Sequence, residues 1–163
     1  MAEPSESIKE FLGGVHYATL ATEDKDGGAH LTPVWYLYED GKFFVETEPA
    51  SKKARNAGAR PRATIVVDSR RRQGEETWVS ASGKAEIIEG DRAAEIHGKI
   101  ARRYLTPEVL HHPEVGPGFE AAGAVIIAIT PDGYKSWSLK DLDEQYFGGV
   151  LGKSPEKWFY EVD

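Results

Sequence analysis

Short apolar runs separated by tight turns dominate this chain and constrain its fold most. We expect strands at 15–22, 30–38, 42–47, 63–68, 77–88 and 121–130, with 134–138 extending the last one. Glycines in the turns at 24–28 and 39–41 supply the positive φ angles that hairpins need. Two longer segments, 51–59 and 91–104, have the pattern of helices, and a short helix is expected to end near residue 12. Six or seven short strands with few helices favour a small barrel.

Three residues or segments punctuate these strands. Gly83 interrupts the long run 77–88, and we expect it to mark a bulge or bend. Pro33 has no backbone N–H to give to a strand ladder, so it suits an edge strand or a bulge. The segment 131–133, Pro-Asp-Gly, is expected to be a turn before the final extension.

Composition excludes several classes of function. The length of 163 residues suggests one domain. The 20 Lys and Arg against 27 Asp and Glu give a net charge of −7, which is opposite in sign to that of most proteins that bind nucleic-acid phosphates. The arginines at 70–72 are therefore interpreted as the solvated tip of a hairpin. The absence of cysteine rules out disulfides and thiolate chemistry. No apolar run approaches the ~20 residues of a membrane helix, and the polar N-terminus is not a signal peptide, so we expect a cytoplasmic protein.

The segment 47–56, which joins a strand to a basic helix, is the strongest candidate for a ligand site. A helix N-terminus presents free N–H groups and the positive end of a dipole, and both favour anions. Thr47 and Ser51 add hydroxyl groups there, and Lys52, Lys53 and Arg55 add positive charge. The alternative is an ordinary solvated basic face. We predict a phosphate contact at Ser51 and Lys53.

No motif for side-chain catalysis is present. The chain has no Gly-x-Ser-x-Gly elbow, no phosphate-binding Gly-x-x-x-x-Gly-Lys loop and no Gly-x-Gly-x-x-Gly after a strand. Two adjacent histidines, His111 and His112, lack the spacing of metal ligands, so no metal site is predicted. The absence of such motifs fits chemistry that a cofactor supplies, because the protein then only orients the cofactor and excludes water.

Four segments are similar to the pyridoxamine 5′-phosphate oxidase-like superfamily, the flavin-binding split barrels. They are GAHLTPVWY at 28–36, TEPASKKARN at 47–56, RPRATIVVD at 60–68 and WVSASGKA at 78–85, and the resemblance spans about residues 7 to 138. It implies a mainly β fold with a few helices, a six-stranded antiparallel split β-barrel. It also implies a homodimer with the cofactor at the subunit interface. Residues 1–138 would form this domain, and 139–163 a C-terminal extension that packs on the barrel or the partner, or is partly disordered.

The resemblance further implies a cofactor, FMN or the deazaflavin coenzyme F-420, and a set of residues around it. Ser51 and Lys53 would hold the phosphate, the strand 32–35 and Thr47 the ring, and Trp78 and Ser80 the partner's cofactor. The full set of expected contacts is Thr32, Pro33, Val34, Trp35, Thr47, Ser51, Lys53, Asn56, Trp78, Ser80 and Trp137. For Trp35 the alternative is a core aromatic, and for Trp78 and Ser80 it is interface packing.

The function implied is hydride transfer from the reduced cofactor to a small electron-poor acceptor, with no catalytic side chain assigned. Two alternatives remain open. The first is a carrier or sensor that binds flavin or deazaflavin without turnover, and the second is a haem-handling split barrel. The partners expected are a second copy of the chain and a small molecule, with neither nucleic acid nor membrane.

Overall fold

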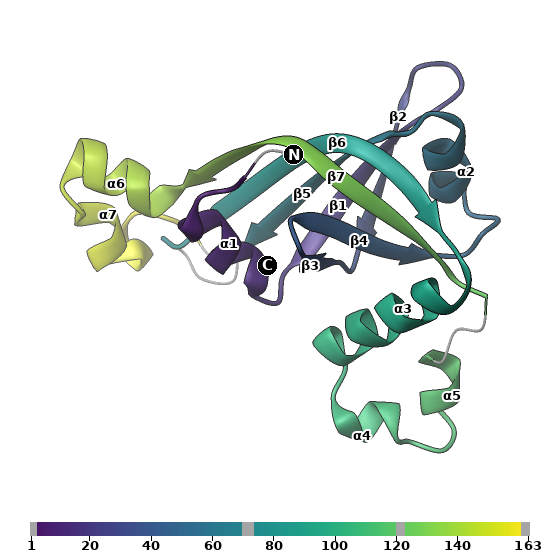
Figure 1. The fold of residues 1–163 in the computed structure, drawn as a ribbon. Helices are drawn as coiled ribbons and strands as arrows, with labels where there is room; N and C mark the ends of the chain where they lie inside the picture. The colour runs from purple at the N-terminus through teal and green to yellow at the C-terminus, as the bar shows by residue number, and fades with distance from the viewer. Residues whose placement is uncertain (1–2, 70–73, 120–122, 161–163) are drawn as a thin grey trace.

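The strands of the protein form one curled antiparallel sheet (Figure 1). The computed structural model describes residues 3–69, 74–119 and 123–160; the arginines at 70–72 and the start of the expected strand 121–130 lie outside them. Seven strands are present among the described residues, in the spatial order β2-β1-β5-β6-β7-β4-β3. They are β1 (Tyr17–Glu23), β2 (Ala29–Val34), β3 (Leu37–Glu39), β4 (Lys42–Thr47), β5 (Arg62–Ser69), β6 (Thr77–Ile88) and β7 (Val125–Ser138).

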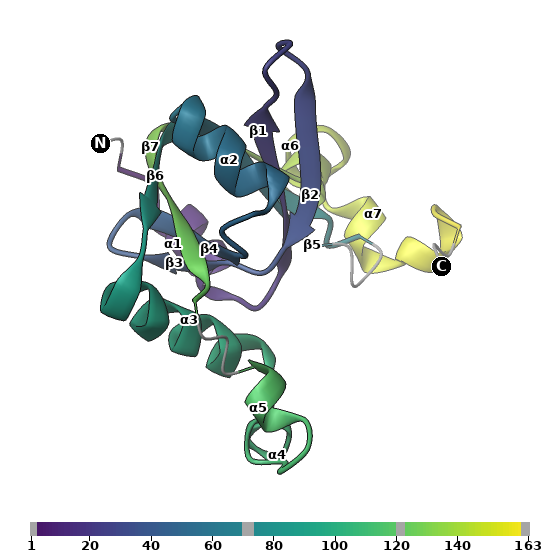
Figure 2. The ribbon, with the colours of Figure 1, turned by 90° about the vertical axis from the view of Figure 1, so that its right-hand side faces the viewer.

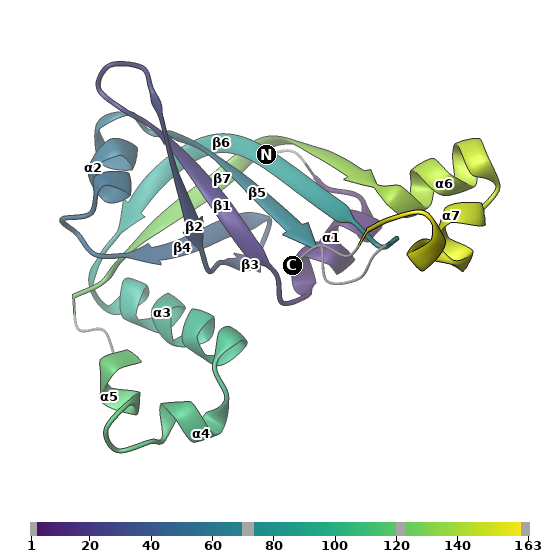
Figure 3. The ribbon, with the colours of Figure 1, turned by 180° about the vertical axis from the view of Figure 1, so that it is seen from behind.

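Helices close the ends and the outer side of this sheet (Figures 2 and 3). They are α1 (Glu6–Gly13), α2 (Lys52–Ala59), α3 (Gly90–Tyr104), α4 (Pro107–Leu110), α5 (Gly116–Phe119), α6 (Leu139–Phe147), α7 (Val150–Lys153) and the 3-10 turn η1 (Pro155–Lys157). Helix α2 lies against β1 and β6, while α3 packs on β3, β4 and β7. Helices α6 and α7 stand at the opposite end of the sheet from α3–α5 (Figure 1). No helix among the described residues is long and apolar enough to cross a bilayer.

Two hydrophobic clusters hold the fold together. The larger one fills the inside of the curl, where alternate residues of each strand point, and includes Leu20, Phe43, Ile65 and Ile127, all fully buried. The smaller one lies between α3 and the other face of β4 and β7, with Ile96 and its neighbours against Phe44, Ile126 and Ala128. The second cluster fixes α3, and with it the arm of α4 and α5, to the sheet.

The predicted single strand 30–38 is wrong, because the chain breaks there into two strands. Strand β2 ends at Val34, and β3 begins at Leu37 on the opposite edge of the sheet. Between them Tyr36 is fully buried, and its hydroxyl donates to the carbonyls of Leu12 and Gly14. The segments on both sides of the break, β2 and β3, are extended strands, so the residue pattern of 30–38 does not reveal where the strand ends. The seventh strand, beyond the six expected, arises from this split.

The expected irregularity at Gly83 is confirmed, but the expected turn at 131–133 is wrong. Strand β7 runs without interruption from Val125 to Ser138 and pairs with β6 over its length. Ser82 pairs with Gly133 and Gly83 with Pro131, so Asp132 is an extra residue on β7. The Pro-Asp-Gly sequence therefore forms a β-bulge and not a turn. One extra residue lies on β7 there, and the strand continues in the same direction.

The segment after β7, in which the sequence shows no regular period, forms two short helices. The Ser138 hydroxyl accepts from the Asp141 N–H at the start of α6, and Gly148 ends that helix with a φ of 62°. The buried Asp143 carboxylate accepts from the backbone of Leu151 and Gly152 and ties α7 back to α6. Local caps and one buried carboxylate thus organise a stretch that lacks hydrophobic periodicity.

Burial of Tyr36 sets an alkaline limit on stability. Loss of solvation raises the pKa of this phenol from 10.0 to about 12. The unfolded chain loses this proton first, so the free energy of unfolding is expected to fall as the pH rises from 10 to about 12. Urea unfolding across this range measures the slope, and in Tyr36→Phe the decline should be shallower. An equally steep decline in Tyr36→Phe would assign the effect to other groups.

Candidate functional site

A groove of about 370 Å³ opens beside the edge of the sheet that ends in β2. The residues that line it come from β1, β2, β4, α2 and the segment between β2 and β3: Tyr17, Pro33, Val34, Trp35, Glu46 and Lys53. Four of the six are among the contacts expected from the sequence, and the fold brings them together from separate elements. Pro33 sits on an edge strand, as expected for a residue without a backbone N–H.

A stack of aromatic rings forms one wall of the groove. Trp35 lies against Tyr104 of α3 with ring centroids 4.8 Å apart and an interplanar angle of 4°. Tyr17 stacks against the same Tyr104 at 6.3 Å. The Tyr104 hydroxyl donates to the His16 carbonyl at 2.6 Å and accepts from the Tyr36 N–H. These bonds fix the stack, so the groove presents rigid aromatic and apolar surface suited to a flat ring.

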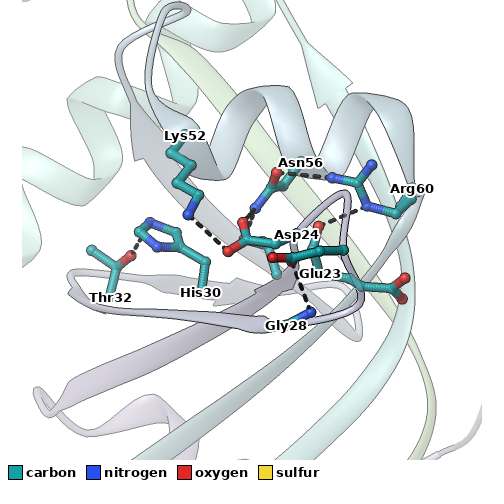
Figure 4. Close-up of polar contacts among 10 residues, drawn as sticks. Glu23, Asp24, Gly28, His30, Thr32, Lys52, Asn56 and Arg60 are labelled. Atoms are coloured by element: carbon teal, nitrogen blue, oxygen red, sulfur yellow. Dashed lines mark hydrogen bonds and ion pairs between the residues drawn. The ribbon is translucent and has the colours of Figure 1, made fainter.

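The three basic side chains of α2 differ in the partners they contact. Lys52 Nζ lies 2.7 Å from Asp24 Oδ2 (Figure 4), and hydrogen bonds from Lys52 and then Asn56 lower the pKa of that carboxyl. Arg55 donates to the carbonyl of Ala50. Lys53, in contrast, has no ion pair or side-chain hydrogen bond within the described part of the chain, and it lines the groove. Lys53 is thus the cation of α2 left available to a ligand.

The start of α2 is held by a chain of hydroxyl groups. The Thr47 hydroxyl, almost fully buried, donates to Ser51 Oγ at 2.9 Å. Ser51 is the N-cap, and its oxygen also accepts from the Ala54 N–H at 3.2 Å. Because both contacts use the oxygen as acceptor, the Ser51 hydroxyl hydrogen can still be donated to an anion.

Two further predicted contacts, Asn56 and Thr32, have partners within the chain. The buried Asn56 amide donates to Thr22 and Asp24 and accepts from Arg60, so each of its polar atoms is engaged (Figure 4). This network joins α2 to the β1–β2 hairpin. Thr32 Oγ1 lies 3.2 Å from His30 Nε2 on the same strand. Neither residue lines the groove, and Asn56 orients the helix that carries Lys53.

The predicted contacts on β6 and β7 lie apart from the groove, on the outer face of the sheet. Trp78 pairs with Trp137 across β6 and β7, and Ser80 follows Trp78 on the same face, because the intervening Val79 is buried. The strand register continues this row from Trp78 to Asp68 on β5 and to Tyr17 on β1. Tyr17 therefore stands where the groove meets the outer face.

Sequence reasoning missed Tyr17 and Glu46, which line the groove, and Tyr104, which supports its wall. The alternation of β1 does place Tyr17 opposite the buried Ala18 and Leu20, but no local signal says what it faces. Glu46 follows three consecutive buried residues of β4 and meets α3 only in the fold. Among the described residues no cluster of three or more His, Asp and Glu side chains could hold a metal.

Comparisons with known proteins extend these findings. A family model described as pyridoxamine 5′-phosphate oxidase matches residues 4–138. A conserved hypothetical protein of Mycobacterium tuberculosis, Rv2991, has a similar structure with a TM-score of 0.72 and 28% identity, over 87% of this chain and 89% of that one. No curated protein matches the chain.

Two more distant solved structures share the fold. An F-420 reductase superposes with a TM-score of 0.62 at 23% identity, over 83% of this chain and 98% of its own. The haem storage protein HutZ of Vibrio cholerae superposes with a TM-score of 0.61 at 16% identity, over 84% and 95%. At these identities the likeness concerns the fold alone.

Proposed function

The chain belongs to the pyridoxamine 5′-phosphate oxidase family, and on that premise we propose that it is an oxidoreductase that uses reduced FMN or coenzyme F-420. The reaction proposed is hydride transfer to a small electron-poor acceptor, such as a conjugated double bond or a quinone. When bound, the reduced ring supplies the hydride, so the residues of the chain have to bind, orient and shield it.

One observation carries this proposal: the groove joins a flat apolar wall to a lysine that has no ion pair among the described residues. Pro33, Val34 and Trp35 offer the surface for a ring, and Lys53 stands at the N-terminal end of α2. A phosphate there would meet the ammonium group, the Ser51 hydroxyl and the free N–H groups of the first helical turn. The residues present therefore fit a planar cofactor with a phosphorylated tail.

The outer face of the sheet supports a homodimer in the same proposal. Tyr17 and Leu31 are 67% and 62% exposed there, and Trp137 is also exposed. Exposed aromatic and aliphatic side chains on one face are typical of surfaces that contact another protein. In the dimer Trp78, Ser80 and Trp137 would face the groove of the partner, which explains why they lie away from the groove of their own chain.

A haem-handling role has less support from this groove. None of the six residues that line it is a histidine, the side chain that most often ligates haem iron. The other alternative, a carrier without turnover, shares the same groove and differs only in the absence of an acceptor reaction.

Titration of the purified protein with FMN and with coenzyme F-420, followed by ring fluorescence, tests the proposal. Binding of one cofactor, followed by its oxidation when quinones or activated alkenes are added, is the expected result. Binding without oxidation by any such acceptor would favour the carrier. If neither cofactor binds, the proposed function is wrong.

Substitution of Lys53 tests the phosphate contact. Lys53→Ala is expected to weaken cofactor binding by about 1.5–3 kcal/mol, the worth of a charged hydrogen bond. Lys52→Ala is the matched control, because it removes the same charge from the same helix turn but only breaks the exposed pair with Asp24. Equal affinities for Lys53→Ala and the unmodified protein would remove Lys53 from the site.

A further inference from the structure

A histidine of α3 lies directly behind the acidic residue of the groove. His97 Nδ1 is 2.8 Å from Glu46 Oε2, and the two side chains are only 12% and 28% exposed. The other ring nitrogen, Nε2, contacts the carbonyl oxygen of Phe119 at the end of α5. Glu46 itself lines the groove together with Lys53.

Both ring nitrogens of His97 face acceptor groups: Nε2 contacts the Phe119 carbonyl, and Nδ1 lies at ion-pair distance from the Glu46 carboxylate, although not in the alignment of a hydrogen bond. A neutral imidazole presents an N–H to only one of these acceptors, whereas the imidazolium presents one to each. The geometry therefore favours a ring with a hydrogen on each nitrogen. The Nδ1 side of the ring faces the carboxylate, a single residue away from the groove.

We propose that Glu46, with His97 behind it, delivers the proton that must accompany hydride transfer in the groove. Glu46 is the group that contacts the reactant, and His97 is a positioning residue that holds the carboxylate and supplies the proton that Glu46 passes on. This inference rests on the proposed function and deepens it. The acceptor is then one that becomes an anion on hydride addition, such as an enone or a quinone.

Hydride adds with its electron pair to one end of the polarised double bond, and the bound cofactor is oxidised by two electrons. The π electrons move to the far atom of the acceptor. The Glu46 carboxylate takes the Nδ1 proton of His97 and passes it to that atom, so that Glu46 ends the step as a carboxylate again. The ring is left neutral with its Nε2–H on the Phe119 carbonyl, and solvent restores the Nδ1 proton.

The first test uses the protein without cofactor. Nitrogen-15 NMR of the His97 ring should show both nitrogens protonated at neutral pH, and Glu46→Gln should return one of them to the unprotonated form. Glu48→Gln is the matched control, since Glu48 is exposed two residues along and does not line the groove. A ring with one bare nitrogen in the unmodified protein would overturn the proposal.

The second test uses the protein loaded with the cofactor that the titration identifies. Glu46→Gln should bind that cofactor with unchanged affinity but reduce an enone about 100-fold or more slowly, as expected for loss of a general acid. The solvent isotope effect should rise, because proton delivery then limits the rate. Glu48→Gln should behave like the unmodified protein, and melting curves check that both variants fold.

His97→Asn separates the two roles within the pair. An asparagine amide can still hold the Glu46 carboxylate but cannot supply its proton. We expect a slow rate here too, so a rate equal to that of the unmodified protein would show that His97 only orients Glu46. Full activity of Glu46→Gln would overturn proton delivery and leave the oxidoreductase standing. Failure of the unmodified protein to bind either cofactor would instead overturn the proposed function and this step with it.

Discussion

Gly83→Ala is expected to destabilise the protein by about 3 kcal/mol or more, the upper end of the cost of overpacking. A Cβ atom at this position would lie 1.9 Å from the carbonyl oxygen of Thr130 and 2.8 Å from Cα of Pro131. These are backbone atoms of β7, so no side chain can rotate away. Relief requires separation of β6 from β7 at the bulge, and these two strands form the longest pairing in the sheet.

Urea unfolding followed by circular dichroism measures this loss. The matched control is Gly133→Ala on the other strand of the same bulge. A Cβ at Gly133 would meet no atom within 4 Å, so that variant should be nearly neutral. If the two variants unfold at the same urea concentration, close approach of the strands is not what requires glycine at position 83.

Arg103→Ala is expected to lower the free energy of unfolding by about 3 kcal/mol. The guanidinium donates to the carbonyls of Leu12, Gly13 and Gly14, at the C-terminal end of α1 where carbonyls have no partners within the helix. Its Cζ atom also lies 5.1 Å from the centroid of the Tyr36 ring. Alanine would remove the side-chain donor of the Gly13 carbonyl, leave those of Leu12 and Gly14 with the Tyr36 hydroxyl alone, and remove the cation from the negative end of the helix.

The same change should loosen the groove, because Arg103 and Tyr104 are neighbours on α3 and Tyr104 backs Trp35. Unfolding in urea gives the stability, and tryptophan fluorescence at low denaturant reports on the Trp35 stack. Arg102→Ala is the control, since Arg102 is exposed on the same helix turn. A loss in Arg102→Ala equal to that in Arg103→Ala would point to helix propensity or net charge and away from the α1 contacts.

Local sequence signals determined most of the strands and the helix of the site. The run 77–88 coincides with β6, and the helix expected at 51–59 is α2 with Ser51 as its cap. Alternation and turn glycines act over neighbouring residues, and hydroxyl caps act over three, so a linear pattern records them. Gly83 was predicted to be irregular on the same grounds, since a glycine inside a strand has no side chain to pack.

Tertiary structure alone decided where the run 30–38 breaks and where the sequence 131–133 continues as a strand. Each of those segments is locally compatible with either outcome. The bulge at Asp132 depends on its pairing with β6, and the break after Val34 depends on burial of Tyr36 beneath α1. These partners lie tens of residues away along the chain.

The sequence by itself determined that positive charge and hydroxyl groups gather at the start of a helix, because helix capping and charge are local. It did not show that Lys52 forms an ion pair with Asp24 while Lys53 lines the groove. Nor did it show that the Asn56 side chain is hydrogen-bonded to Thr22, Asp24 and Arg60. It gave no sign that Glu46 meets His97. Each of these contacts joins elements that the chain brings together only when the sheet curls, so the physical reason for them is packing in three dimensions.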